Sequence, residues 1–148
     1  MKKLCCLIFI LTLNVQSYAQ KPIEIKTNPF TLLIPESAIF LISAETILSE
    51  SWGAELDLVV GEFNLAYVSG KHYFNPKVGG DGFFLGAFAG GILSDETSIG
   101  AGFFLGKKWL SSKNVLLDIG IGLGRGSDGL LPYAKLHVGY RFRSKQGG

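Results

Sequence analysis

The chain has 148 residues, of which 47% are apolar, and its 14 Lys and Arg nearly balance its 12 Asp and Glu. This length is enough for one domain of ordinary size and too short for two. The formal net charge of +2 gives no basic surface of the kind that binds nucleic acid. We therefore expect one domain and no nucleic-acid partner.

The first 19 residues have the features of a secretory signal peptide. Lys2 and Lys3 form a basic start, residues 4–15 are mostly apolar, and small residues lie next to a cleavage site after Ala19. The apolar run is shorter than the roughly 20 residues that a membrane-spanning helix needs. We expect cleavage after Ala19, which leaves residues 20–148 as one domain with twelve basic and twelve acidic side chains.

Both cysteines, Cys5 and Cys6, belong to the predicted signal peptide. They precede its apolar core, whereas attachment of a lipid anchor would need a cysteine after that core. The exported chain therefore has no thiol, no disulfide framework and no cysteine ligand for a metal.

Eight segments after the signal peptide have the composition and alternation that predict strands. In chain order they are residues 23–34, 39–48, 52–61, 64–74, 83–93, 98–109, 115–126 and 131–143. Turn signals rich in Pro, Gly, Asn, Asp and Ser separate most of them. No segment has the pattern of a helix or a linker. An even number of strands is what single-chain outer-membrane barrels have.

The clearest strand is residues 115–126, because successive side chains of a strand point to opposite faces. Its odd positions are Val115, Leu117, Ile119, Ile121 and Leu123, and its even positions include Asp118, Gly120, Gly122 and Gly124. In a soluble barrel of the lipocalin type the aliphatic face would be the core, and the glycines would form the surface. Eight strands enclose a space that side chains fill, so placing the glycines inside and the aliphatic residues toward lipid is more favourable. The sequence therefore predicts an all-β, eight-stranded antiparallel up-and-down transmembrane β-barrel.

This orientation places a polar network inside the barrel. Its predicted members are Glu45, Glu55, Asp57, Lys71, Asp118, Lys135, His137 and Arg141. An unpaired buried charge costs several kcal/mol, so we expect these side chains to form ion pairs and hydrogen bonds that fill the interior. Eight strands leave no room for an open pore beside them, which predicts a non-conducting barrel.

Aromatic residues near the strand ends predict girdles that face the lipid head groups. They are Trp52, Tyr73, Phe74, Trp109, Tyr133, Tyr140 and Phe142. The phenylalanines in the middle of residues 83–93 and 98–109 leave the inward face of the first of these two strands undecided.

Short motifs carry a resemblance to known proteins. They are Ile25-Lys26-Thr27-Asn28-Pro29, Lys71-His72-Tyr73-Phe74-Asn75-Pro76 and the closing Val138-Gly139-Tyr140-Arg141-Phe142. With them the chain resembles the small outer-membrane β-barrel proteins of Gram-negative bacteria, and more narrowly a family of such barrels with no assigned activity. The resemblance implies a location in outer-membrane lipid and insertion by the assembly machinery, which recognises the last strand. The chain departs from the pattern in residues 143–148, which follow the last aromatic residue and bear on that recognition.

Two families of eight-stranded outer-membrane barrels are enzymes that modify lipid A, with sites built on His and Ser. Here Ser69 and His72 are three residues apart, which places them on opposite faces of a strand. No His and acid cluster has metal-ligand spacing, and the glycines of residues 120–124 precede no helix that could hold a phosphate. We expect no catalytic residue, cofactor or metal. The predicted role is structural, or an interaction with another envelope protein; a lipid-modifying enzyme and a lipocalin-like binding barrel are the alternatives.

Overall fold

The computed structural model describes residues 21–32, 40–61, 64–92, 98–127 and 129–142. The predicted signal peptide, residues 1–19, and the polar tail, residues 143–148, lie outside the described residues. Among the described residues, no helix has the length and apolar character needed to cross a membrane.

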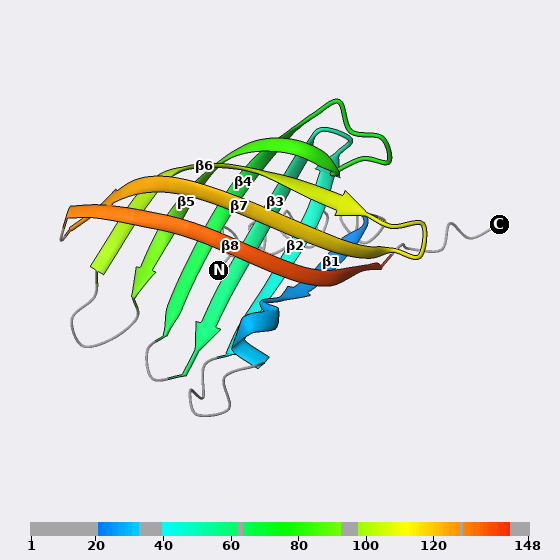
Figure 1. Ribbon diagram of the computed structural model, residues 1–148. Coiled ribbons are helices and arrows are strands. Elements are labelled where there is room, and N and C mark those ends of the chain that lie inside the picture. Colours follow the sequence, from blue (N-terminus) through cyan, green and yellow to red (C-terminus); the bar gives the residue numbers. More distant parts are fainter. Residues whose placement is uncertain (1–20, 33–39, 62–63, 93–97, 128, 143–148) are drawn as a thin grey trace, which may run out of the picture.

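The described strands form a closed antiparallel barrel in which each strand pairs with its neighbours in the chain and β1 pairs with β8 (Figure 1). They are β1 (Ile23–Thr27), β2 (Phe40–Ser49), β3 (Trp52–Val60), β4 (Leu65–Phe74), β5 (Gly82–Ile92), β6 (Ser98–Leu110), β7 (Val115–Gly126) and β8 (Gly129–Phe142). The prediction of an all-β, eight-stranded antiparallel up-and-down barrel is confirmed.

The first strand is shorter than predicted. β1 ends at Thr27, and the chain continues into a short 3-10 helix, η1 (Pro29–Leu32). Pro29 has no N–H to donate to a neighbouring strand, and the side chain of Asn28 accepts a hydrogen bond from the Phe30 N–H at 2.9 Å, which turns the backbone. The prediction of one strand over residues 23–34 was wrong because apolar composition outweighed these turn residues.

The two faces of the wall have opposite compositions. In β7, Ile121 and Leu123 are 62% and 60% exposed, whereas Asp118 between Leu117 and Ile119 is fully buried. The same alternation holds around the barrel, so large apolar side chains cover the outside. On the outward face of the described strands the charged side chains are Lys107 and Arg125, which lie near opposite ends of their strands.

The two ends of the barrel differ as well. We call the end with the β2–β3, β4–β5 and β6–β7 turns the turn end, and the opposite end the loop end. At the turn end the β4–β5 turn folds against the interior: Gly80 donates to the Glu50 carbonyl at 2.8 Å, and Arg141 donates to the carbonyls of Gly79 and Gly80 at 2.8 and 3.1 Å. Gly80 has a φ of 60°, a conformation that favours glycine.

Candidate functional site: the barrel interior

All eight side chains predicted to face inward are buried in the structure. Their exposed fractions run from 0% for Lys71 and Asp118 to 6% for Lys135. The structure adds three charged residues that sequence reasoning missed, Glu24, Lys26 and Lys108, each no more than 1% exposed. The signal that could have found the first two is their alternation with the outward Ile23 and Ile25.

Two lysine ammonium groups lie at the centre of the interior between three carboxylates. Lys71 Nζ is 2.7 Å from Glu45, 2.6 Å from Glu55 and 2.8 Å from Asp118. Lys26 Nζ is 2.6 Å from Glu45 and 3.0 Å from Asp118, and it also contacts Glu55. These residues come from β1, β2, β3, β4 and β7, so the ion pairs join strands across the barrel.

The network continues toward both ends. At the turn end Lys108 Nζ is 2.7 Å from Glu24 and 2.9 Å from Glu45, and Arg141 donates to Glu24 at 2.6 and 2.8 Å. Toward the loop end Lys135 Nζ is 2.7 Å from Glu55 and 3.2 Å from Asp118. The strands thus place five carboxylates and five cationic groups inside, which leaves the described interior formally neutral when His137 is neutral. We call this set the ion-pair network.

The other half of the interior is aromatic. Tyr73, Phe84, Phe88 and Phe104 form a buried cluster from β4, β5 and β6, and Tyr67, Leu131 and Tyr133 pack against it. The prediction that Tyr73 and Tyr133 belong to lipid-facing girdles was wrong. Tyr73 shares the inward face with Ser69 and Lys71, and Tyr133 shares it with Lys135, so their closeness to a strand end does not decide which face they take.

Lysine ammonium groups join the two halves. Lys108 Nζ lies 4.7 Å from the centre of the Tyr73 ring, Lys71 Nζ lies 5.1 Å from that of Phe84, and Lys135 Nζ lies 5.2 Å from that of Phe104. Such contacts are favourable because a cation is attracted to the negative face of a ring, more so away from water. Each of these three lysines therefore has carboxylates on one side and a ring on the other.

His137 and Asp57 lie at the loop end of the ion-pair network and are less completely partnered. His137 Nδ1 is 3.7 Å from Glu55 and 4.0 Å from Asp57, distances too long for hydrogen bonds. Among the described residues, neither ring nitrogen of His137 nor Asp57 Oδ1 has a hydrogen-bond partner. The other oxygen of Asp57 accepts a hydrogen bond from the Tyr133 hydroxyl at 3.3 Å.

Two sets of side chains have the spacing of metal ligands. They are Glu55, Asp57 and His137, and Glu45, Glu55 and Asp118, whose ligand atoms lie within 4.8 Å of one another. Sequence spacing could not show them, since each set combines strands that are distant in the chain. In the set of Glu45, Glu55 and Asp118, Lys26 and Lys71 already contact all three carboxylates. In the set of Glu55, Asp57 and His137, the same two lysines and Lys135 contact Glu55. The chain's own ammonium groups thus take the place of a cation around Glu55.

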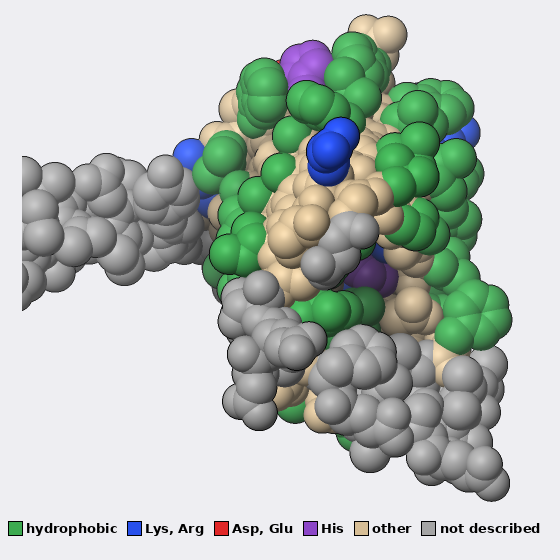
Figure 2. All heavy atoms as spheres, turned by 90° about the vertical axis from the view of Figure 1, so that its left-hand side faces the viewer, with side chains coloured by type: hydrophobic (Ala, Val, Ile, Leu, Met, Phe, Trp, Pro, Cys, Tyr) green, Lys and Arg blue, Asp and Glu red, His purple; other side chains and the backbone are tan. Residues whose placement is uncertain are grey.

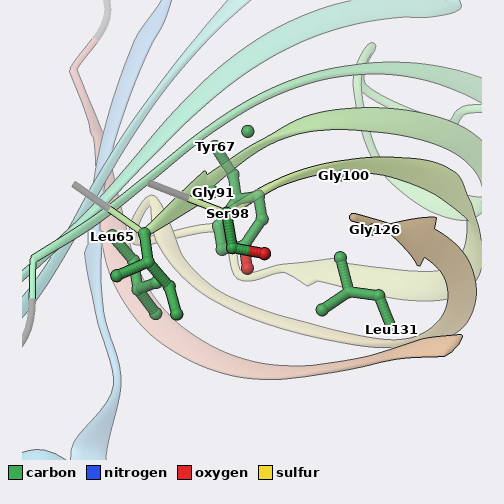
Figure 3. Close-up of a pocket in the computed structure, with 9 residues that line it drawn as sticks. Leu65, Tyr67, Gly91, Ser98, Gly100, Gly126 and Leu131 are labelled. Carbon is green, nitrogen blue, oxygen red and sulfur yellow. The ribbon is translucent and has the colours of Figure 1, made fainter. Parts of the chain in front are cut away.

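Two chambers lie at the loop end. The polar chamber has a volume of about 220 Å³ and is lined by Asn28, Leu41, Asp57, Val59, Leu65, Tyr67, Pro132, Tyr133, Ala134, Lys135 and His137. The apolar chamber, about 350 Å³, lies beside it among β4 to β8, with the side chains of Leu65, Tyr67 and Leu131 around it (Figure 3). Figure 2 faces this end and shows hydrophobic side chains over the flanks of the barrel, with histidine atoms inside a hollow.

Ser69 and His72 lie on opposite faces of β4, as their spacing predicts. Ser69 is buried inside, whereas His72 lies on the outer wall between Trp52 and Phe74, with ring centres 4.7 and 5.0 Å away. The two side chains therefore do not form a pair.

No protein-family model, curated protein or solved structure matches the chain.

Proposed function

We propose that this chain is an integral outer-membrane β-barrel whose outer wall contacts lipid and whose filled interior does not conduct ions. The observation that carries the proposal is the inverted distribution of residues. Apolar side chains such as Phe103, Leu105 and Ile121 are 58–70% exposed on the wall, while ten charged side chains are buried inside. Soluble monomers rarely expose a continuous apolar surface larger than a few hundred Å².

The same distribution argues against a lipocalin-like soluble barrel. Such a barrel would hold its ligand in an apolar interior and present polar residues to water. Here the described interior holds five carboxylates and five cationic groups, and the outward face of the strands carries Lys107 and Arg125 as its charged residues.

Aromatic side chains on the outer wall support a membrane boundary at the turn end. Trp52, Trp109, Tyr140 and Phe142 are 43–53% exposed there, as expected of a girdle at the level of the head groups. Lys107 lies among them, with its Nζ 4.6 Å from the ring centre of Phe83 and 4.9 Å from that of Trp109. A lysine stem along apolar surface with its ammonium at the boundary is typical of a membrane interface.

The predicted signal peptide and the resemblance to small outer-membrane barrels support export to the outer membrane and insertion by the assembly machinery. Paired charges and rings occupy the interior. The Ser43 hydroxyl donates a hydrogen bond to Glu55 at 2.8 Å, but both side chains are buried, and Glu55 is held by Lys26, Lys71 and Lys135. These features fit a compact, non-enzymatic membrane protein with a structural role in the envelope. Its outer wall would contact lipid or another envelope protein.

Heating tests the membrane assignment. The full chain is expressed in a Gram-negative host, extracted from the membrane fraction with detergent, and run unboiled and boiled on a denaturing gel. A detergent-resistant barrel should migrate differently before and after boiling, because it unfolds only on heating. A product found in the soluble periplasmic fraction with no shift in mobility contradicts the proposal.

Planar-bilayer recording tests the filled interior. The purified barrel should give no stable channels, because ion pairs and rings occupy the space that eight strands enclose. Long-lived open channels of uniform conductance from the purified protein would contradict this part of the proposal, and boiled protein serves as the control.

A further inference from the structure

Lys107 on the outer wall has no opposite charge beside it. Its side chain is partly exposed, and its Nζ lies 4.6 Å from the ring centre of Phe83 and 4.9 Å from that of Trp109. Within the part of the chain that the structure describes, these two rings are its only side-chain partners, whereas each inward lysine contacts a carboxylate. The rings hold the ammonium in place and leave it able to bind an anion from outside the chain.

The strands around Lys107 offer no carboxylate to pair with it. In register, Lys107 lies between Phe83 of β5 and Ile119 of β7. On the outward face of the described strands the other charged residue is Arg125, which is also basic and lies near the loop end. The ammonium of a zwitterionic head group would therefore find no acidic partner on these strands, so Lys107 favours a head group with a net negative charge.

An apolar groove of about 520 Å³ begins beside Lys107 on the outside of β5, β6 and β7. Its lining includes Phe103, Leu105 and Ile121, which are 58–70% exposed. Leu105 lies two residues from Lys107 on the same face of β6, which is about 7 Å along a strand. Gly122, which alternates with the outward Ile121, also lines the groove, so the groove reaches the backbone of the wall. The groove therefore runs from Lys107 toward the loop end.

The cation and the groove follow one another in the order of the parts of a phospholipid. In a bilayer the phosphates lie at the boundary and the acyl chains extend toward the middle. On β6, Trp109 and Lys107 lie at the turn end, where the aromatic girdle marks the boundary, and the groove continues from Leu105 into the wall. A water-soluble anion would leave the groove empty, so a lipid accounts for both features.

We infer that Lys107 binds the phosphate of an anionic phospholipid in the leaflet at the turn end, with one acyl chain of this lipid in the groove on β5, β6 and β7. The inference rests on the proposed membrane location. That proposal requires only that the wall contacts lipid of any kind, whereas the inference adds a preference for negative charge at one place on the wall.

Tryptophan fluorescence tests the inference, because Trp109 and Trp52 are the two tryptophans of the chain and both lie on the outer wall at the turn end. The barrel is inserted in phosphatidylcholine vesicles with a minor fraction of phosphatidylglycerol, and bromine, which quenches tryptophan, is placed on the acyl chains of one lipid or the other. In Trp52→Phe, which leaves Trp109, quenching should show about a fivefold preference for phosphatidylglycerol, as expected of one lysine at a membrane surface. In Trp109→Phe, which leaves Trp52, it should show none.

Charge variants in the Trp52→Phe background test the role of Lys107. Lys107→Gln should abolish the preference. Lys113→Gln in the exposed β6–β7 turn at the same end is the matched control and should retain it. Inorganic phosphate added at the concentration of phosphatidylglycerol should leave the quenching unchanged, whereas a loss of quenching would show a site for a free anion and overturn the inference.

The remaining outcomes separate this inference from the proposed function. Equal quenching of Trp109 by the two lipids, or a preference that survives in Lys107→Gln, overturns the inference, while a heat shift still supports the membrane barrel. Barrels that form dimers in the vesicles without a lipid preference would show that a second copy covers the groove, which also overturns it. Protein that shows no heat shift and no quenching by either lipid overturns both.

Discussion

The inner and outer faces of the same strands differ in what keeps them stable. On the outer face of β7, Ile121 and Leu123 are mostly exposed, so these two positions require only an apolar side chain. On the inner face, Asp118 needs ammonium groups from β1, β4 and β8 at 2.8–3.2 Å, and Gly122 lies against Phe104 of β6. The stability of the outer face therefore depends on composition alone, and that of the inner face depends on charge pairing and close packing. Substitutions on the two faces should therefore destabilise the barrel for different reasons.

The largest effect is expected from removing one partner of the ion-pair network. Lys71→Met takes away one of two ammonium groups between Glu45, Glu55 and Asp118. The uncompensated buried charge should lower the free energy of unfolding by about 3–5 kcal/mol. Urea titration of the barrel in lipid vesicles measures this change. Lys113→Met in the exposed β6–β7 turn is the control and should change little. Equal stability of the two variants would refute a stabilising network.

A charge on the outer face is expected to have the next largest effect. Ile121→Arg should lower the free energy of unfolding by about 2–4 kcal/mol if the position lies near the bilayer midplane. Ile121→Leu should be nearly silent, since any aliphatic side chain satisfies this face. The same urea titration measures both. A wall that faces water would instead accept Ile121→Arg without loss.

The smallest effect is expected from a substitution that overpacks the inner face of the barrel. A Cβ on Gly122 would lie 2.5 Å from the Phe104 Cβ and 2.7 Å from its Cα, whereas a Cβ on Gly70, on the outer face of β4, would meet nothing within 4 Å. Gly122→Ala should therefore cost about 1–3 kcal/mol through overpacking, and Gly70→Ala should be neutral. If the two variants unfold at the same urea concentration, the inner face is not closely packed.

Much of this fold could be predicted because a strand has a period of two. The alternation of Asp118 with Ile119, and of Lys135 and His137 with Leu136, decides which face each residue takes without reference to any other strand. The predicted range 115–126 is the range of β7. The eight predicted interior residues are placed inside for the same reason.

The remaining features depend on contacts between strands and could not be predicted in this way. The nearness of His137 on β8 to Asp57 on β3 comes from packing across the barrel interior, which no sequence spacing records. The end of β1 at Thr27 is different, because it follows from the local turn residues Asn28 and Pro29, and the pairing of β1 with β8 stops at Val138 for that reason. Sequence reasoning therefore predicted most of the charged interior and missed the polar chamber beside it.

Collision accessibility of a spin label at Ile121 tests most directly whether the outer wall contacts lipid. In a Cys5→Ser, Cys6→Ser background, a single cysteine at position 121 or at position 113 carries a nitroxide, and the labelled barrel is inserted in vesicles. We predict that the label at position 121 collides often with oxygen, which concentrates in lipid, and rarely with a water-soluble nickel chelate, while the label at position 113 does the reverse. Nickel collision rates at position 121 as high as those at position 113 would show that the wall faces water and would contradict the account.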